Sequence, residues 1–289
     1  MDMVGSGNAD QFESMDLLQD LVTASSLSYL DNTSDEGEQS SKMQASPYFT
    51  NKLKPLAQFV ESKTESGATI FEYSNGNDEA TLVVACRGSA TPINFSTNLR
   101  FRLVPLALGS GDTSENYLVH EGFQVASTGL WELLLQNLTP IVQGNNKYSN
   151  IVFTGHSLGA ANALLCATQY QTYSLEASNF PTLNGVITFG GPRLVNSPLA
   201  EHWNDSLFAS CKVQNYVHAK DPILRQNGPL WDSLGFGIVG TEIPCEPFEA
   251  TAYVTAQQRQ EYDAKDLPVA WNILDHCNYL GIFVGPRLF

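Results

Sequence analysis

The sequence has few basic side chains and no long apolar run. Fifteen lysine and arginine residues stand against thirty aspartate and glutamate residues, which leaves a formal net charge of -15. A field of this sign repels nucleic acid and anionic membrane surfaces, so we expect neutral partners and no nucleic-acid binding. No apolar stretch approaches the roughly 18 residues that a membrane-spanning helix needs. The sequence therefore predicts no transmembrane segment.

Cysteine is scarce as well. The five cysteines are widely spaced and include no CxxC pair, which excludes a disulfide-dominated scaffold and a zinc site of that type. Cys86 and Cys166 lie in apolar segments, where small buried residues are expected. One disulfide among Cys211, Cys245 and Cys277 stays open. We expect no metal and no cofactor.

The start of the chain shows no secretory leader. The first thirty residues contain acidic and polar side chains where a signal peptide has a basic start followed by an apolar stretch. We therefore expect an intracellular protein, unless the chain is a processed form of a secreted one. The localisation stays open between these two alternatives.

The length of 289 residues fits one large domain with an appended terminal piece. Apolar residues in 11–30 recur at helical spacing, and residues 31–42 form a polar stretch that is typical of a loop. Residues 1–65 match no motif, and we interpret them as an N-terminal extension of helix and loop packed on the core. Residues 66–289 are assigned to the main domain.

Strand and helix alternate along this main domain. Residues 68–73 and 80–86 are rich in β-branched side chains, and the turn-forming sequence between them predicts a hairpin. Beyond Pro229 only residues 252–254 look extended. Strands that are apolar on both faces favour a mostly parallel sheet covered by helices on both sides, so the predicted fold class is α/β. The remaining predicted elements are helix 123–142, strand 151–153, helix 160–170 and strands 186–189 and 213–217.

A Gly-x-Ser-x-Gly pattern at Gly155 to Gly159 lies between a predicted strand and a predicted helix. A sharp turn there forces Ser157 outward, and only glycines let the strand and the helix approach so closely. The first N–H of the helix, from Leu158, points to where an oxyanion forms during acyl transfer. The alternatives are a serine-capped turn or a phosphate loop, and no glycine-rich phosphate motif or lysine supports the second. The pattern indicates a nucleophile.

A serine nucleophile needs a histidine base and a carboxylate that orients it. His276 is the histidine that lies late enough in the chain for the order Ser, Asp, His, and Asp221 directly follows the strand at 213–217. Asp205 and Asp232 are weaker candidates for the acid. Taken alone, Asp221 is equally typical of an ordinary turn, and His276 of a solvated loop. The other four histidines, which are expected to be structural, are His120, His156, His202 and His218.

Together these motifs resemble the class 3 lipases, and the resemblance covers roughly residues 66–281. It implies an α/β-hydrolase fold, a triad of Ser157, Asp221 and His276, and an oxyanion hole formed by Ser89 and Leu158. The sequence departs from the family at Asn98, where fungal members usually carry aspartate. The segments that carry the resemblance are Arg87-Gly88-Ser89, Val119-His120-Glu121-Gly122-Phe123, Gly155-His156-Ser157-Leu158-Gly159-Ala160, Thr188-Phe189-Gly190-Gly191-Pro192-Arg193, Lys220-Asp221-Pro222-Ile223 and Asp275-His276-Cys277-Asn278-Tyr279.

Family members carry a lid helix after the oxyanion segment. Apolar residues Phe95, Leu99, Leu103 and Leu106 recur here at helical spacing, which predicts a lid within residues 90–110; the alternatives are a buried crossover helix and an irregular core segment. The expected function is hydrolysis of lipid acyl esters through an acyl-enzyme on Ser157, with an acyl-ester lipid at a lipid–water interface as the partner. The alternatives are a non-lipid esterase and a lipase-like interaction protein without turnover.

Overall fold

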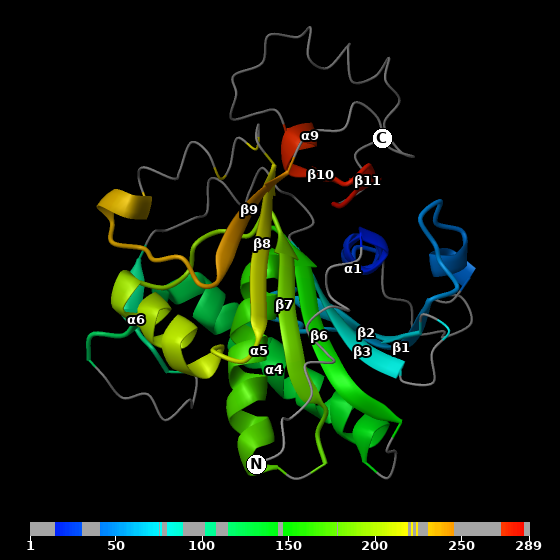
Figure 1. Ribbon diagram of the computed structural model, residues 1–289, viewed down its shortest axis with the longest axis horizontal. Helices are drawn as coiled ribbons and strands as arrows, with labels where there is room; N and C mark the ends of the chain where they lie inside the picture. Colours follow the sequence, from blue (N-terminus) through cyan, green and yellow to red (C-terminus); the bar gives the residue numbers. More distant parts are fainter. Residues whose placement is uncertain are drawn as a thin grey trace, which may run out of the picture.

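A computed structural model describes most of the chain (Figure 1). The residues that it describes are 15–30, 41–74, 76, 80–88, 102–107, 115–143, 147–177, 179–218, 221, 224, 231–245 and 273–285. Within these residues no helix is both long enough and apolar enough to cross a membrane.

A seven-stranded sheet in the order β1-β2-β3-β6-β7-β8-β9 forms the centre of the protein. The first three strands pair antiparallel, and β3 pairs parallel with β6, so that β3, β6, β7, β8 and β9 form the parallel part. The predicted α/β class with a mostly parallel sheet is therefore confirmed. The strands are β1 (Leu53–Val60), β2 (Gly67–Tyr73), β3 (Ala80–Arg87), β6 (Tyr148–His156), β7 (Thr182–Phe189), β8 (Lys212–His218) and β9 (Thr241–Cys245).

Helices cover both faces of this sheet (Figure 1). Helices α4 (Glu121–Val142) and α5 (Leu158–Glu176) pack on one face, and α1 (Met15–Leu27) packs on the other. Side chains of β6 alternate between the two layers: Phe153 joins the α4–α5 side and Val152 joins the α1 side. Both are almost completely buried, which explains why a parallel central strand is apolar throughout.

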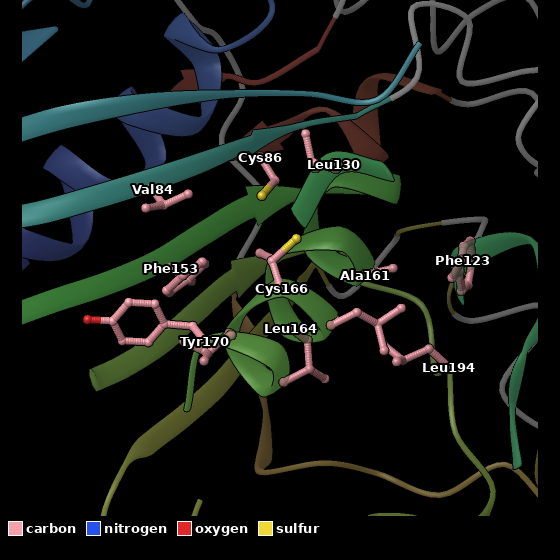
Figure 2. Close-up of a cluster of buried hydrophobic side chains, with 14 of the residues drawn as sticks. Val84, Cys86, Phe123, Leu130, Phe153, Ala161, Leu164, Cys166, Tyr170 and Leu194 are labelled. Carbon is pink, nitrogen blue, oxygen red and sulfur yellow. The ribbon is translucent and has the colours of Figure 1, made fainter. Parts of the chain in front are cut away.

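The core beneath α5 is tightly interleaved. Figure 2 shows Val84, Cys86 and Phe153 of the sheet facing Cys166 and Tyr170 of α5. The rings of Phe153 and Tyr170 have centroids 5.5 Å apart, within the range of favourable aromatic pairs. Both cysteines are buried free thiols, as predicted for small core residues.

The three remaining cysteines are not joined in a disulfide, so the pairing that the sequence left open among Cys211, Cys245 and Cys277 does not form. Burial raises the pKa of the Cys211 thiol to about 12. Such a thiol carries little thiolate at neutral pH, and thiolate is the form that attacks a disulfide or an oxidant.

Several predicted elements match the structure. The hairpin is β2 with β3, the helix at 11–30 is α1, and the strands at 151–153, 186–189 and 213–217 are the centres of β6, β7 and β8. The sequence did not predict β1 or β9. Both are edge strands that contain proline and are half-exposed, so neither shows the alternating apolar pattern of a strand with one buried face. Strand β1 lies inside the stretch 1–65 that was interpreted as helix and loop; the domain boundary stays a prediction.

The helical interpretation of the segment around Leu103 and Leu106 is wrong. Leu103–Pro105 forms strand β4, which pairs antiparallel with β5 (Leu118–His120), and the N–H of Leu106 donates to the carbonyl of Tyr117 at 2.9 Å. This pairing satisfies the backbone that a helix would have satisfied internally. Phe95 and Leu99 lie outside the described residues, as do Asn98 and residues 252–254.

The carboxyl ends of β3, β6, β7 and β8 meet at one edge of the sheet, because parallel strands end on the same side. Figure 1 shows α9 (Ile273–His276), followed by β10 (Asn278–Tyr279) and β11 (Ile282–Phe283), above this edge. Helix α6 (Ser197–His202) and the π-helix Trp203–Leu207 connect β7 to β8. Ser157, Asp221 and His276, which the sequence predicts to be functional, lie at the edge where α9 lies.

Candidate active site

Ser157 occupies a strained turn between β6 and α5. Its φ of 58° and ψ of -125° are uncommon for a residue with a Cβ atom, and its N–H donates to the carbonyl of Phe189 at 3.0 Å. A Cβ at Gly155 would lie 2.4 Å from the carbonyl oxygen of Gly159, and a Cβ at Gly159 would lie 2.2 Å from that of Cys86. The two glycines are therefore needed for the close approach of strand and helix. The turn has the shape of a nucleophile elbow.

His276 and Asp221 form a buried pair at the same edge. The Nδ1 atom of His276 lies 2.7 Å from Oδ2 of Asp221, and both side chains are fully buried. The Asp221 carboxylate also accepts hydrogen bonds from the hydroxyl of Tyr279 at 3.1 Å and from the N–H of Leu224 at 3.1 Å. A carboxylate only accepts, so the bond to His276 places the imidazole proton on Nδ1 and leaves the lone pair on Nε2.

Tyr279 fixes the orientation of this carboxylate. Burial raises the pKa of Tyr279 well above its usual value, and the charge of Asp221 raises it further, so the phenol remains protonated and donates. The sequence analysis quoted Tyr279 within a motif but gave it no role. A tyrosine three residues after the candidate histidine is the signal that points to this contact.

The imidazole of His276 lies beside the elbow. Its Cε1 atom is 3.2 Å from where a Cβ of Gly190 would stand, and Gly190 directly follows the carbonyl that binds the Ser157 N–H. The ring of His156, the neighbour of Ser157, has its centroid 4.7 Å from that of His276. Among the described residues, neither Oγ of Ser157 nor Nε2 of His276 has a hydrogen-bond partner. Such contacts often close only when substrate binds.

Of the two predicted oxyanion donors, the structure describes Leu158 but not Ser89. Leu158 is the first residue of α5, directly after the elbow, where helix N–H groups point toward the space above the serine. Ser89 lies outside the described residues, which end at Gly88 on this side of the gap. The pairing of these two residues in an oxyanion hole stays a prediction.

The other candidate acids have different surroundings. Asp232 forms an ion pair with Arg193, whose guanidinium also lies 3.3 Å from Glu242. Asp205 lies in the π-helix between β7 and β8. The structure therefore brings Asp221, and not these two residues, into contact with His276.

The remaining histidines are distributed over the fold. His120 caps α4 and accepts from the N–H of Phe123 at 3.4 Å, and His202 stacks on Tyr117 with ring centroids 5.0 Å apart. His218 ends β8, with Nε2 4.0 Å from a carboxylate oxygen of Asp275. His156 contacts the backbone of His276, which the sequence gave no reason to expect.

The loop after β7 is held by a side-chain amide. Asn215 accepts from the N–H of Gly191 at 2.9 Å and donates to its carbonyl at 2.8 Å. This loop lines one side of a cleft that is open to solvent, and the lining also includes Ala160, Arg193 and Glu242 but no predicted triad residue. Within the described part of the chain, no cluster of histidine, cysteine and acidic side chains is arranged to hold a metal ion.

A family model described as Lipase (class 3) matches residues 83–229, which is half of the chain. The chain belongs to the class 3 lipase family. The family resemblance inferred from the motifs is thereby confirmed, and the matched region contains both the elbow and Asp221. His276 lies beyond it.

Similar proteins come from plants and fungi. This member of the class 3 lipase family is 26% identical over 194 residues to the phospholipase A1 EG1 of Oryza sativa subsp. indica, and 28% identical over 174 residues to a lipase of Rhizopus niveus. These matches cover 58% and 59% of the chain but 43% and 41% of the two relatives. The chain thus spans about two fifths of the length of these two relatives.

Solved lipases share the fold. The triacylglyceride lipase of Rhizomucor miehei superposes with a TM-score of 0.67 at 20% identity, covering 95% of this chain and 98% of that chain. The LIP2 lipase of Yarrowia lipolytica gives a TM-score of 0.67 at 17% identity, covering 95% and 96%. At such identities the likeness establishes the fold, and the predicted α/β-hydrolase architecture is confirmed.

Proposed function

We propose that this class 3 lipase family member is a serine ester hydrolase that cleaves acyl esters of lipids through an acyl-enzyme on Ser157. The observation that carries the proposal is the buried 2.7 Å contact between His276 and Asp221 beside a serine held in a strained elbow. Membership in a family of lipases supports the ester-hydrolase class. The names of the relatives, which are lipases and phospholipases A1, favour acylglycerols and related lipids as substrates.

The geometry suits a two-step acyl transfer. Nε2 of His276 takes the proton of the Ser157 hydroxyl as its oxygen attacks the ester carbonyl carbon. Asp221 stabilises the imidazolium that results, while the N–H groups of Leu158 and Ser89 are proposed to bind the oxyanion. The tetrahedral intermediate collapses when the imidazolium protonates the leaving alkoxide. Water then attacks the acyl-enzyme by the same route and releases the carboxylic acid.

A chain-length series of p-nitrophenyl esters, from acetate to palmitate, tests the proposal. The wild type is expected to hydrolyse medium and long chains, and Ser157→Ala is expected to lower kcat by about a millionfold, as loss of a serine nucleophile does in other hydrolases. If the wild type hydrolyses none of these esters, the proposal that the protein is an ester hydrolase is refuted. Activity confined to the shortest esters would refute the lipid substrate and leave the non-lipid esterase. Emulsified and dissolved substrate, compared at equal total concentration, test whether the enzyme acts at a lipid–water interface.

A further inference from the structure

Helix α1 ends next to the elbow. The hydroxyl of Ser25 lies 3.1 Å from that of Thr154 in β6, and the hydroxyl of Ser26 donates to the carbonyl of Phe283 in β11 at 2.7 Å. Figure 1 shows α1 between the sheet and β11. The helix therefore contacts both the strand that leads to Ser157 and the segment that follows His276.

Tyr29, two residues beyond α1, reaches the elbow with its hydroxyl. The oxygen lies 2.8 Å from Nδ1 of His156 and packs against the backbone of Gly88. A Cβ at Gly88 would stand 2.0 Å from this oxygen, so the hydroxyl occupies space that only glycine leaves open. Gly88 belongs to the segment that leads to Ser89, the proposed oxyanion donor. One phenol thus contacts two parts of the proposed site.

The ring of His156 extends the contact to the base. Its Nε2 atom lies 2.7 Å from the carbonyl oxygen of His276. A carbonyl only accepts, so Nε2 carries the proton and donates. Burial, and next the nearby His276, lower the pKa of His156 well below its usual value, so the ring is neutral and Nδ1 accepts from the Tyr29 hydroxyl. Both ring nitrogens are thereby assigned.

We propose that Tyr29 is a positioning residue for the hydrolysis: through His156 it holds the backbone of His276, and through Gly88 it holds the oxyanion segment. The inference rests on the proposed function, because it assigns these contacts a role in presenting base and oxyanion donor to Ser157. His276 ends a four-residue helix, which has little internal hydrogen bonding to fix its position. A bond from a buried, rigid ring to the His276 carbonyl supplies that constraint.

Tyr29→Phe tests the proposal, because it keeps the ring and removes the hydroxyl. We expect kcat for a p-nitrophenyl ester to fall about tenfold with KM within about twofold, since misplaced catalytic groups act on the chemical step. Tyr73→Phe is the matched control. Tyr73 packs in one buried cluster with α1, so loss of its hydroxyl also perturbs the docking of α1 but leaves the elbow untouched. Equal kcat in the two variants would overturn the proposal.

A double-mutant cycle tests whether Tyr29 acts through His156. His156→Asn removes the ring that receives the Tyr29 hydrogen bond. If the contact through His156 operates, Tyr29→Phe lowers kcat about tenfold in the wild-type background and clearly less in the His156→Asn background, where only its contact with Gly88 remains. The same tenfold loss in both backgrounds would overturn it, because the hydroxyl would then act without His156.

One readout does not depend on turnover. The proton on Nδ1 of His276, shared with Asp221, gives a downfield proton resonance whose position reports that contact. We expect this resonance to shift or broaden in Tyr29→Phe and to stay unchanged in Tyr73→Phe. An unchanged resonance in both variants would overturn the positioning role. An inactive wild type would instead refute the proposed hydrolysis, so the two failures are distinguishable.

Discussion

Replacement of Ser157 by glycine is expected to stabilise the protein while it abolishes hydrolysis. A residue with a Cβ at φ 58° and ψ -125° costs about 1–3 kcal/mol of folding free energy. Glycine adopts this conformation without strain. It also gives the unfolded chain more conformational freedom, which lowers the free energy of unfolding by roughly 0.4–1 kcal/mol. The net gain is about 1 kcal/mol, or about 2 °C in Tm for a protein of this size.

Ser157→Ala is the control that isolates the backbone strain. It removes the same hydroxyl, which is buried and has no hydrogen-bond partner among the described residues, but it keeps the Cβ atom. Urea unfolding followed by circular dichroism measures the difference between the two variants at equal m-values. If Ser157→Gly unfolds at the same urea concentration as Ser157→Ala, or at a lower one, the turn stores no strain and the reasoning is refuted.

Two further predictions concern hydrogen-bonded carboxylates. Tyr279→Phe removes a hydrogen-bond donor to the buried Asp221, so kcat should fall about tenfold. Urea unfolding should show a free energy of unfolding lower by about 1.5–3 kcal/mol, as for hydrogen bonds to charged groups. Unchanged kcat and stability would contradict this. At Glu72 burial opposes ionisation, yet hydrogen bonds from Lys147 and Tyr148 lower the pKa below 4.5. A lowered pKa gives stability that is present above the unfolded value and lost as pH falls through the folded value. Glu72→Gln should therefore flatten the fall in Tm below about pH 4.5; an unchanged acid slope would contradict the assignment.

The parallel core could be predicted from the sequence because burial on both faces leaves a continuous apolar run. Strands β6 and β7 each carry such a run, and the elbow adds a local pattern of glycines at the end of β6. The choice of Asp221 and His276 followed from their order along the chain. The structure places these two side chains in contact, which the order alone did not ensure.

The elements that sequence reasoning missed lack a local signal. Strand β1 carries Pro55 and an irregular register, and most of its side chains are half-exposed, so no face is uniformly apolar. Leu103 and Leu106 fit a helical spacing, but pairing with β5 determined their conformation instead. Tyr29 and His156 are 127 positions apart, and no period or motif connects residues at that distance.

Helix α1 packs between the sheet and β11, so the proposed site depends on contacts between early and late parts of the chain. The bond between Ser26 and Phe283 joins residues 257 positions apart, and the bond between His156 and His276 joins residues 120 positions apart. Synthesis proceeds from the N-terminus, so the nascent chain carries Ser157, the proposed nucleophile, long before it carries His276, the proposed base. Contacts between residues so far apart in the sequence form late in folding, because the entropy cost of closing a long loop must be overcome first. If hydrolysis proceeds as proposed, an emerging chain stays unreactive toward esters until residues 273–285 dock.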